Sequence, residues 1–286
     1  MERIASTAVV KGEIGEGVQI GMGSYIGPNV KLGDRVQIGN YVTLDGNIEI
    51  GEGSRVDSYT LILGNCQIGK NNHIYSHAVL GSDPQDLKYR GEENYLIIGD
   101  NNKIREFTLI NPGTEGGGRV TKIGDGNLLM GYVHVAHDVE IGNGCILANG
   151  ATLAGHVKLE DFVVIGGLTP IHQFVQVGEM AMVAGASAVS QDIPPYTLAE
   201  GNRAKIRGLN LVGLRRRLKD RTEIDRLKRA YRELFLSGQP VREVARRLLE
   251  ESESRYVRHL AQFVLNSKRG IPFERPSNLK REESGE

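Results

Sequence analysis

A six-residue repeat constrains this chain more than any other feature of its sequence. An aliphatic residue recurs at every sixth position from Ile14 to Leu80, from Ile98 to Ile110 and, after a slip of one residue, from Ile123 to Val189. A period of six fits neither an α-helix nor an ordinary strand, whose side chains alternate. It is typical of a parallel β-helix, in which each repeat forms one flat side of a prism and its aliphatic residue points inward. Three sides make one coil, and coils stack at about 4.8 Å.

Two segments interrupt the repeat. The first, about residues 81–97, is polar, and the repeat resumes in phase after it. The second, about residues 111–122, is glycine-rich and lacks the spacing of a phosphate-binding loop, so we expect a plain flexible loop. Loops that leave a rigid scaffold often carry function. The repeat domain is predicted to cover residues 1–195 and to end at the pair Pro194-Pro195.

Beyond residue 195 the hydrophobic pattern becomes helical. We expect a C-terminal segment, residues 196–286, that is mainly α-helical from about residue 208. Thr222, with Asp225 three residues later, predicts a capped helix start, and two further helices follow it. The last dozen residues are rich in charge, Ser and Pro and are expected to be frayed. The predicted fold is therefore mainly β, a parallel β-helix with a C-terminal α-helical domain.

Composition excludes several classes of partner. The 35 basic and 35 acidic residues balance, so nothing favours nucleic acid or an anionic membrane. No stretch approaches the roughly 20 apolar residues of a membrane span. Cys66 and Cys145 stand alone, which fits two buried small hydrophobic residues in a reducing compartment. With no targeting segment before the repeat, we expect a cytoplasmic protein.

Histidines stand out among the polar residues of the second repeat block. They are His134, His137, His156 and His172, and the last three fall within one residue of a common column on successive coils. Three interpretations stay open: a zinc site, a base beside a substrate groove, or hydrogen bonds between coils. The one-residue offsets turn these side chains in different directions, which counts against zinc. His137 is followed by Asp138, a pair that suits a base whose ring is oriented by a carboxylate.

Longer motifs resemble the UDP-N-acetylglucosamine O-acyltransferases that begin lipid A synthesis. The resemblance covers essentially the whole chain, and its motifs are specific to that family rather than to hexapeptide proteins at large. It implies a left-handed β-helix and a homotrimer with active sites between subunits, without metal or cofactor. The segments that carry it are residues 84–89, 127–173, 191–196, 200–202, 208–210 and 214–217.

The resemblance implies catalytic roles for three residues. His137 would be the general base that takes the proton from the sugar 3-position as it attacks the acyl thioester. Asp138 would orient the imidazole. The backbone N–H of Gly155 would bind the oxyanion, a contribution of several kcal/mol in comparable sites.

The resemblance also implies substrate-binding residues. His134, His156 and His172 would line the groove and bind sugar or diphosphate. Asp86 and Lys88 would come from the loop of a neighbouring subunit, with Asp86 near the sugar and the acyl hydroxyl.

Further binding roles fall on the C-terminal part of the chain. Gln173 would help to hold the donor. Asn210, Arg216 and Arg217 would meet the nucleotide, with the arginines on phosphate. Gly185 matches the position that limits acyl-chain length, and its missing side chain favours a longer chain.

The implied donor is an acyl chain on acyl carrier protein, a strongly acidic domain. Between Arg215 and Arg232 nine basic residues face three acidic ones, which fits an acidic partner.

Departures from the family leave the acceptor open. Asn111 and Pro112 stand where the best-known members carry a His-Arg pair, and Val212 stands where a nucleotide-contacting Glu is familiar. The implied reaction is transfer of an (R)-3-hydroxyacyl chain to the 3-position of UDP-N-acetylglucosamine. Alternatives are transfer to a 3-amino analogue, the related N-acyltransferase that acts later, and a non-catalytic β-helical assembly module.

Overall fold

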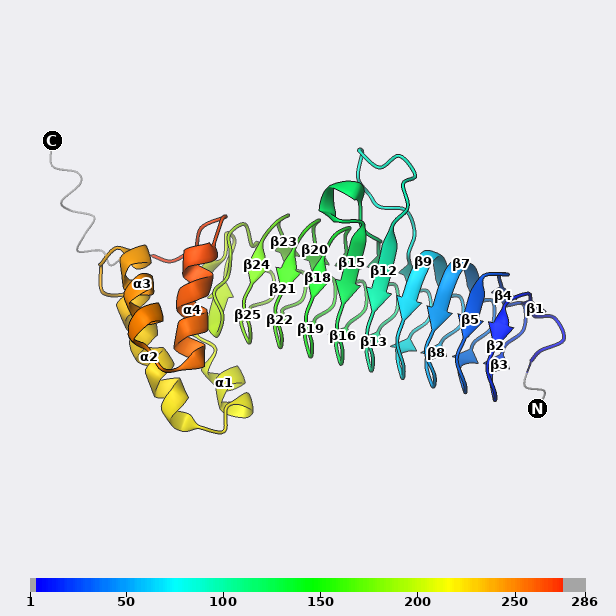
Figure 1. The fold of residues 1–286 in the computed structure, drawn as a ribbon, viewed down its shortest axis with the longest axis horizontal. Coiled ribbons are helices and arrows are strands. Elements are labelled where there is room, and N and C mark those ends of the chain that lie inside the picture. Colours follow the sequence, from blue (N-terminus) through cyan, green and yellow to red (C-terminus); the bar gives the residue numbers. More distant parts are fainter. Residues whose placement is uncertain (1–3, 275–286) are drawn as a thin grey trace.

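The structure, a computed structural model, describes residues 4–274. Figure 1 shows a long prism of stacked strands that carries a helical domain at its C-terminal end. The predicted parallel β-helix with a C-terminal helical domain is confirmed. The predicted frayed tail lies outside the described residues.

The prism has three faces, and every strand pairing within the coils is parallel. Two faces join into one 16-stranded sheet, because two eight-residue strands, β7 (Thr43–Ile50) and β9 (Leu61–Ile68), run from one face onto the next. The other strands of the first face are β1 (Val9–Val10), β4 (Tyr25–Ile26), β11 (Val79–Leu80), β14 (Leu109–Ile110), β17 (His134–Val135), β20 (Thr152–Leu153) and β23 (Pro170–Ile171). Those of the second face are β2 (Glu13–Ile14), β5 (Val30–Leu32), β12 (Tyr95–Ile98), β15 (Val120–Ile123), β18 (Glu140–Ile141), β21 (Lys158–Leu159) and β24 (Gln176–Val177).

The third face is an 11-stranded sheet. Its strands are β3 (Gln19–Ile20), β6 (Gln37–Ile38), β8 (Arg55–Val56), β10 (His73–Ile74), β13 (Lys103–Ile104), β16 (Leu128–Leu129), β19 (Ile146–Leu147), β22 (Val164–Ile165), β25 (Met182–Val183), β26 (Thr197–Glu200) and β27 (Lys205–Leu209). Strand β26 adds to β25 in parallel and β27 returns antiparallel, so the sheet continues past residue 195 to residue 209.

The repeat works because equivalent residues stack one coil apart. Val135 pairs with Leu153, and Leu153 pairs with Ile171. All three side chains are buried, so each inward column is a continuous run of branched aliphatic residues. Cys66 and Cys145 are also buried, and burial raises the pKa of both thiols to about 12.

Most corners of the prism are tight turns whose third residue has positive φ. Between the first and second faces this residue is Asp138 (φ 60), His156 (φ 62) and Phe174 (φ 64) on three successive coils. We call residues 136–138, 154–156 and 172–174 the histidine corner. Since the turn repeats in register, the outward side chains of one corner form columns along the prism.

The corner between the third and first faces carries a column of stacked aromatic rings. Successive ring centroids are 5.0 to 5.4 Å apart along this column, which we call the aromatic corner: Tyr41, Tyr59, His77, Phe107 and Tyr132. All five side chains are exposed. Further along the same corner lie the exposed Leu168, at 74 % exposure, and Gly185. A solvent-facing apolar column thus runs along one edge of the prism.

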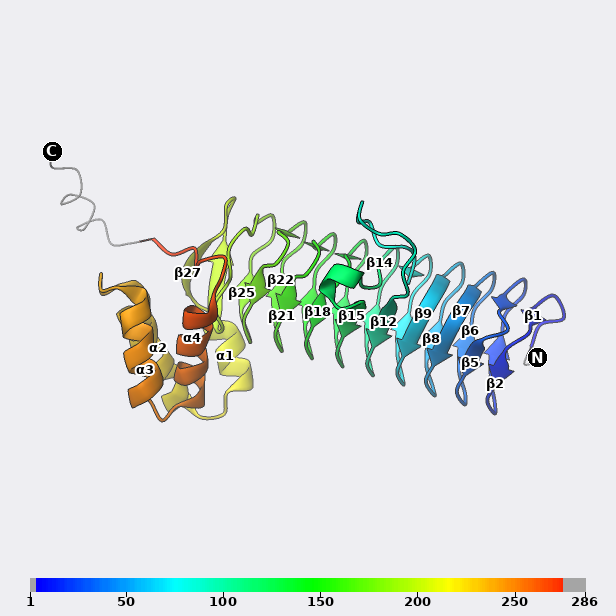
Figure 2. The same ribbon diagram turned by 45° about the horizontal axis from the view of Figure 1, so that its top comes forward.

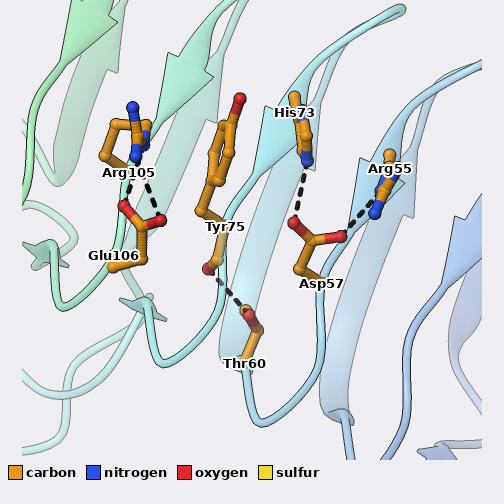
Figure 3. Close-up of polar contacts among 7 residues, drawn as sticks. All are labelled: Arg55, Asp57, Thr60, His73, Tyr75, Arg105 and Glu106. Atoms are coloured by element: carbon orange, nitrogen blue, oxygen red, sulfur yellow. Dashed lines mark hydrogen bonds and ion pairs between the residues drawn. The ribbon is translucent and has the colours of Figure 1, made fainter.

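A polar network ties three neighbouring coils of the third face together (Figure 3). Asp57 contacts Arg55 Nε at 2.7 Å and His73 Nε2 at 2.9 Å. Tyr75 stacks between His73 and the guanidinium of Arg105. These side chains contact one another across the coils, so we interpret them as a network that stabilises the fold.

Both excursion loops leave the prism at the histidine corner and stand together above it (Figure 1). They span residues 81–94 and 111–119 between the flanking strands. The second is not the plain flexible loop that the sequence suggested: it contains the short 3₁₀ helix η1 (Glu115–Gly117), and Thr114 before it is buried.

The helical domain caps the end of the prism in both ribbon views (Figure 2). It consists of α1 (Leu211–Arg217), α2 (Arg221–Phe235), α3 (Val241–Glu251) and α4 (Arg255–Asn266). The cap of α2 is Asp220, not the predicted Thr222, because the Asp220 carboxylate accepts hydrogen bonds from both the N–H and the hydroxyl of Thr222. Among residues 4–274 no helix combines the length and the apolarity needed to cross a bilayer.

One histidine fastens this domain to the prism. His259 of α4 lies 3.0 Å from Glu160 and 2.8 Å from the hydroxyl of the buried Tyr196, which donates to Glu179. Burial lowers the pKa of His259, but hydrogen bonds to Glu160 and Glu179 outweigh it and raise this pKa to about 9.

We expect this junction to make stability depend on pH. A histidine in the unfolded chain has a pKa near 6.5, so the folded protein holds the proton of His259 more tightly. Its stabilising contribution is complete below about pH 6.5 and is lost as the pH rises through about 9. In thermal unfolding, the difference in Tm between wild type and His259→Gln should be largest near pH 6 and should vanish toward pH 10. A difference independent of pH would contradict a protonated His259.

Candidate functional site

The structure brings His137 and Asp138 into direct contact at the histidine corner. His137 Nδ1 lies 2.7 Å from Asp138 Oδ2, and the two side chains are 14 % and 1 % exposed. The carboxylate also accepts from the Thr114 N–H at 2.7 Å and from its hydroxyl at 2.6 Å. The Asp138 N–H donates to Thr121 Oγ1, which fixes the backbone at this left-handed turn.

These bonds keep the carboxyl group ionised. Burial raises the pKa of Asp138, but hydrogen bonds from His137 and Thr114 outweigh it and hold the pKa below its usual value. A carboxylate can only accept, so His137 must carry its proton on Nδ1. Nε2 of His137 is then the ring nitrogen that can accept a proton.

His156 lies on the next coil beside this pair. Its ring meets the His137 ring edge-on at 5.1 Å and stacks on Phe174 at 4.4 Å. Its Nδ1 is 3.7 Å from Asp138 Oδ2. Burial lowers the pKa of His156, and the charge of Asp138 offsets only part of this effect. The net shift favours the neutral ring.

The spacing of His137, Asp138 and His156 could in principle hold a metal ion, since their ligand atoms lie within 4.8 Å of one another. The carboxylate oxygens, however, already accept three hydrogen bonds from Thr114 and His137. A cation would have to displace them, so the arrangement suits proton transfer better than metal binding.

Gly155 lies directly against the imidazole of His137. A Cβ on Gly155 would stand 2.5 Å from Cε1 of His137, so only glycine fits there without moving the imidazole. At equivalent turns elsewhere the N–H donates to an Asp or Asn side chain one coil on, as Asn143 does to Asp161. The residue one coil on from Gly155 is Gln173, and no acceptor for the Gly155 N–H occurs among residues 4–274. This N–H is available to a ligand.

The other two histidines lie away from this cluster. His134 lies on strand β17, where burial lowers its pKa, and its buried Nδ1 has no partner within residues 4–274. His172 is exposed and its Nδ1 contacts the carbonyl oxygen of the exposed Gln173. Neither joins the cluster of His137, Asp138 and His156.

The first excursion loop reaches the same corner. The Lys88 N–H donates to the side chain of Asp86, and the charges of both residues act on His156 of their own protomer. Asn111 anchors the loop, because its Nδ2 donates to the carbonyl oxygens of Ser82 and Asp83 at 3.0 Å each. These two bonds fix the amide orientation, and the buried Oδ1 has no partner within the described chain. Pro112 beside it is buried.

The remaining candidates lie on other parts of the prism. Gly185 is at the aromatic corner. Arg216 and Arg217 are exposed in the last turn of α1, and Arg217 stacks over Phe162 at 3.9 Å, on the corner between the second and third faces. One protomer therefore does not gather these residues around His137.

Asn210 and Val212, at the start of α1, differ in their hydrogen bonding. Asn210 caps this helix: its Oδ1 accepts from the Gly213 N–H and its Nδ2 donates to the Met180 carbonyl oxygen. Its side chain thus already has a structural role. Val212, at 59 % exposure, presents no polar group to a nucleotide.

Sequence reasoning missed Thr114, Thr121 and Phe174. A threonine in a glycine-rich loop carries no signal of its own, because its partner Asp138 is 24 residues away. Phe174 could have been found, since it lies one coil on from His156 in the same column.

Comparison with known proteins agrees with this architecture. Residues 192–272 match the family model described as "Udp N-acetylglucosamine O-acyltransferase; Domain 2". Residues 11–46, 47–82 and 121–155 match "Bacterial transferase hexapeptide (six repeats)".

Individual relatives are similar over most of their length. An acyl-[acyl-carrier-protein]–UDP-N-acetylglucosamine O-acyltransferase of Nautilia profundicola is 72 % identical over 198 residues, 69 % of this chain and 76 % of the relative. The crystal structure of a UDP-N-acetylglucosamine acyltransferase is 47 % identical with a TM-score of 0.81, over 96 % of this chain and 99 % of that one. The enzyme from Arabidopsis gives 39 % identity and a TM-score of 0.89, over 94 % and 99 %.

The fold, the candidate site and the sequence comparisons indicate the same family. The hexapeptide prism, the His137–Asp138 pair at its corner and a relative with 72 % identity all agree. This chain belongs to the family of UDP-N-acetylglucosamine O-acyltransferases.

Proposed function

We propose that this enzyme transfers an (R)-3-hydroxyacyl chain from acyl carrier protein to the 3-position of UDP-N-acetylglucosamine, the first step of lipid A synthesis, with His137 as general base. The observation that carries the proposal is the 2.7 Å contact between His137 Nδ1 and the ionised Asp138, which directs Nε2 away from the carboxylate, with Gly155 packed against the ring. An imidazole held in this tautomer presents Nε2 as a proton acceptor, which is what a general base requires.

The chemistry follows from these groups. Nε2 of His137 takes the proton of the sugar 3-hydroxyl as its oxygen attacks the thioester carbonyl, and Asp138 stabilises the imidazolium that forms. The Gly155 N–H donates to the tetrahedral oxyanion. The attack forms the C–O bond of the tetrahedral intermediate. Collapse of this intermediate restores the C=O bond and breaks the C–S bond, and the imidazolium returns the proton to the departing thiolate of the carrier.

Substrate binding requires a second copy of the chain. His137 lies at the histidine corner, whereas Gly185 lies at the aromatic corner and Arg217 at the third. If these residues serve one active site, the histidine corner of one copy must face another corner of the next. Such a head-to-tail contact repeated around a three-cornered prism closes as a homotrimer. The exposed rings of the aromatic corner would then be covered by the neighbour.

The remaining binding roles follow the family resemblance. His134, His156, His172 and Gln173 would line the groove with Asp86 and Lys88 at its rim. Arg216 and Arg217 would bind the diphosphate, next to the helix cap formed by Asn210.

The donor side fits an acidic carrier and a long chain. The exposed arginines of α1 and the basic face of α2 would guide acyl carrier protein electrostatically, an effect that salt weakens. Gly185 is exposed, and a Cβ there would meet only the backbone of Gly167, at 3.3 Å, so the groove stays open to a longer chain. The reaction needs a compartment that holds the carrier, and the two buried, unpaired cysteines fit the cytoplasm.

Transfer to a 3-amino sugar nucleotide is the second candidate. The buried Oδ1 of Asn111 is an acceptor that lacks a donor within the described residues, and the strand before Asn111 pairs with the strand that precedes His137. A 3-amino group has two N–H bonds, so it can donate one to this oxygen and still give up the other in acyl transfer, which a hydroxyl cannot do. A non-catalytic assembly module would need no such organised pair of histidine and carboxylate.

Mass spectrometry of the products tests the proposal. Purified enzyme is incubated with UDP-N-acetylglucosamine or its 3-amino analogue and a ladder of 3-hydroxyacyl carrier proteins. We expect an ester product with a long chain, and Gly185→Met should shift the preferred chain to a shorter one. An amide product alone would establish the second candidate, and no product with either acceptor would refute both.

A further inference from the structure

The glycine-rich loop does more than bridge two coils. Thr114 makes two of the hydrogen bonds that Asp138 accepts, one from its N–H and one from its hydroxyl, both at 2.7 Å or less. Thr114 itself is 4 % exposed. The third bond to the carboxylate comes from His137, so within residues 4–274 every hydrogen-bond donor to the Asp138 carboxylate other than the imidazole belongs to Thr114.

The loop also closes over the carboxylate physically. A Cβ on Gly117, in η1, would overlap the Asp138 carboxyl group. A Cβ on the adjacent Gly116 would meet nothing within 4 Å. One glycine of η1 is therefore needed for close approach to Asp138, and its neighbour is not.

We propose that two residues of the second excursion loop, Thr114 and Gly117, position the catalytic pair: Thr114 orients Asp138, and Gly117 lets the loop seal the carboxylate from water. This inference rests on the proposed role of His137 as base. Thr114 acts through Asp138 and does not itself touch substrate, so it is a positioning residue rather than a catalytic one.

The physical reason lies in the cost of a buried carboxylate. Asp138 has a side chain that is 1 % exposed, so its charge must be satisfied by donors. Without the Thr114 hydroxyl, the pKa of Asp138 rises, because this hydrogen bond stabilises the ionised form of the carboxyl group. The carboxylate also becomes free to rotate, which weakens the hold on the Nδ1 tautomer of His137.

Thr114→Val tests the hydroxyl alone, since it keeps the shape and the backbone N–H. We expect kcat to fall about tenfold to a hundredfold with little change in KM. The acidic limb of the kcat/KM profile should move to higher pH. Thr114→Ser should restore most of both. Thr60→Val is the matched control, because Thr60 is equally buried but donates to the Tyr75 carbonyl oxygen, away from the site.

The two glycines give a second, steric test. Gly117→Ala should lower kcat by about a hundredfold, because Asp138 must move, whereas Gly116→Ala should match wild type. Equal activity of Gly117→Ala and wild type would overturn the proposal. So would an unchanged pH profile in Thr114→Val, or the same loss of kcat in Thr60→Val.

A readout independent of turnover separates this inference from the proposed function. The proton on His137 Nδ1, bonded to a carboxylate, should give a downfield resonance in the ¹H NMR spectrum of the full-length protein. His137→Ala, which removes it, assigns the signal. We expect the signal to shift or vanish in Thr114→Val and Gly117→Ala and to persist in Thr60→Val and Gly116→Ala. Persistence in all four variants would refute the positioning role even if the enzyme acylates UDP-N-acetylglucosamine as proposed.

Discussion

Replacement of His137 by alanine is expected to lower acyl transfer by about 10² to 10⁴-fold and to leave the unfolding temperature nearly unchanged. The activity falls because, among residues 4–274, only the His137 ring lies within hydrogen-bond distance of Asp138; His156 Nδ1 is 3.7 Å from the carboxylate. Stability should survive because Asp138 keeps both hydrogen bonds from Thr114. Turnover with acyl carrier protein and UDP-N-acetylglucosamine, read together with a melting curve, checks both halves.

His73→Ala is the matched control for this substitution. His73 also contacts a carboxylate, that of Asp57 at 2.9 Å, but on the third face of the prism (Figure 3). The His73→Ala variant should therefore lose the contact with Asp57 and keep its turnover. If His137→Ala retained activity, or unfolded the protein, its role as the base would be rejected.

Gly155→Ala should have the second largest effect, a loss of about a hundredfold or more in kcat. The added methyl group would stand 2.5 Å from Cε1 and 2.7 Å from Nε2 of His137, so the imidazole must swing away from both Asp138 and the acceptor hydroxyl. Steady-state kinetics should show the loss in kcat, with the affinity for the sugar nucleotide less affected.

Gly131→Ala is the control for Gly155→Ala. Gly131 occupies the equivalent turn position at the aromatic corner, where a Cβ would meet only Asn149 Nδ2 at 3.2 Å and a carbonyl oxygen at 3.4 Å. We expect it to cost little activity. Similar losses in the two variants would mean that the turn, rather than the imidazole, is sensitive to a methyl group.

The sequence predicted the architecture because the fold depends on one local rule repeated many times. Ile123, Ile141 and Leu159 occupy the same position on three successive coils, so their spacing in the sequence is enough to predict that they stack. The pairing of His137 with Asp138 was predictable for the same reason, since adjacent residues at one corner need no long-range information. The offsets between His137, His156 and His172 also follow from counting along the repeat.

What escaped prediction depends on contacts across irregular segments. Nothing in the composition of residues 111–119 says that Thr114 folds back onto Asp138. The helix cap was misplaced because Thr222 and Asp220 are both good capping residues, and only the observed bonds from Thr222 to the Asp220 carboxylate decide between them. The hairpin of β26 and β27 was missed because it breaks the six-residue period.

The register of the coils limits how such a chain can change length in evolution. Side chains that meet across coils, such as Asn47 and Asn65 or Asn143 and Asp161, are 18 residues apart. Loss or gain of 18 residues shortens or lengthens the prism and leaves every later residue on its own face. Loss of six residues would instead rotate the whole downstream part by one face and carry the helical domain away from its present orientation on the prism. Deletions and duplications in this lineage should therefore be tolerated as entire coils, while insertions of arbitrary length should accumulate at the corner from which residues 81–94 and 111–119 emerge.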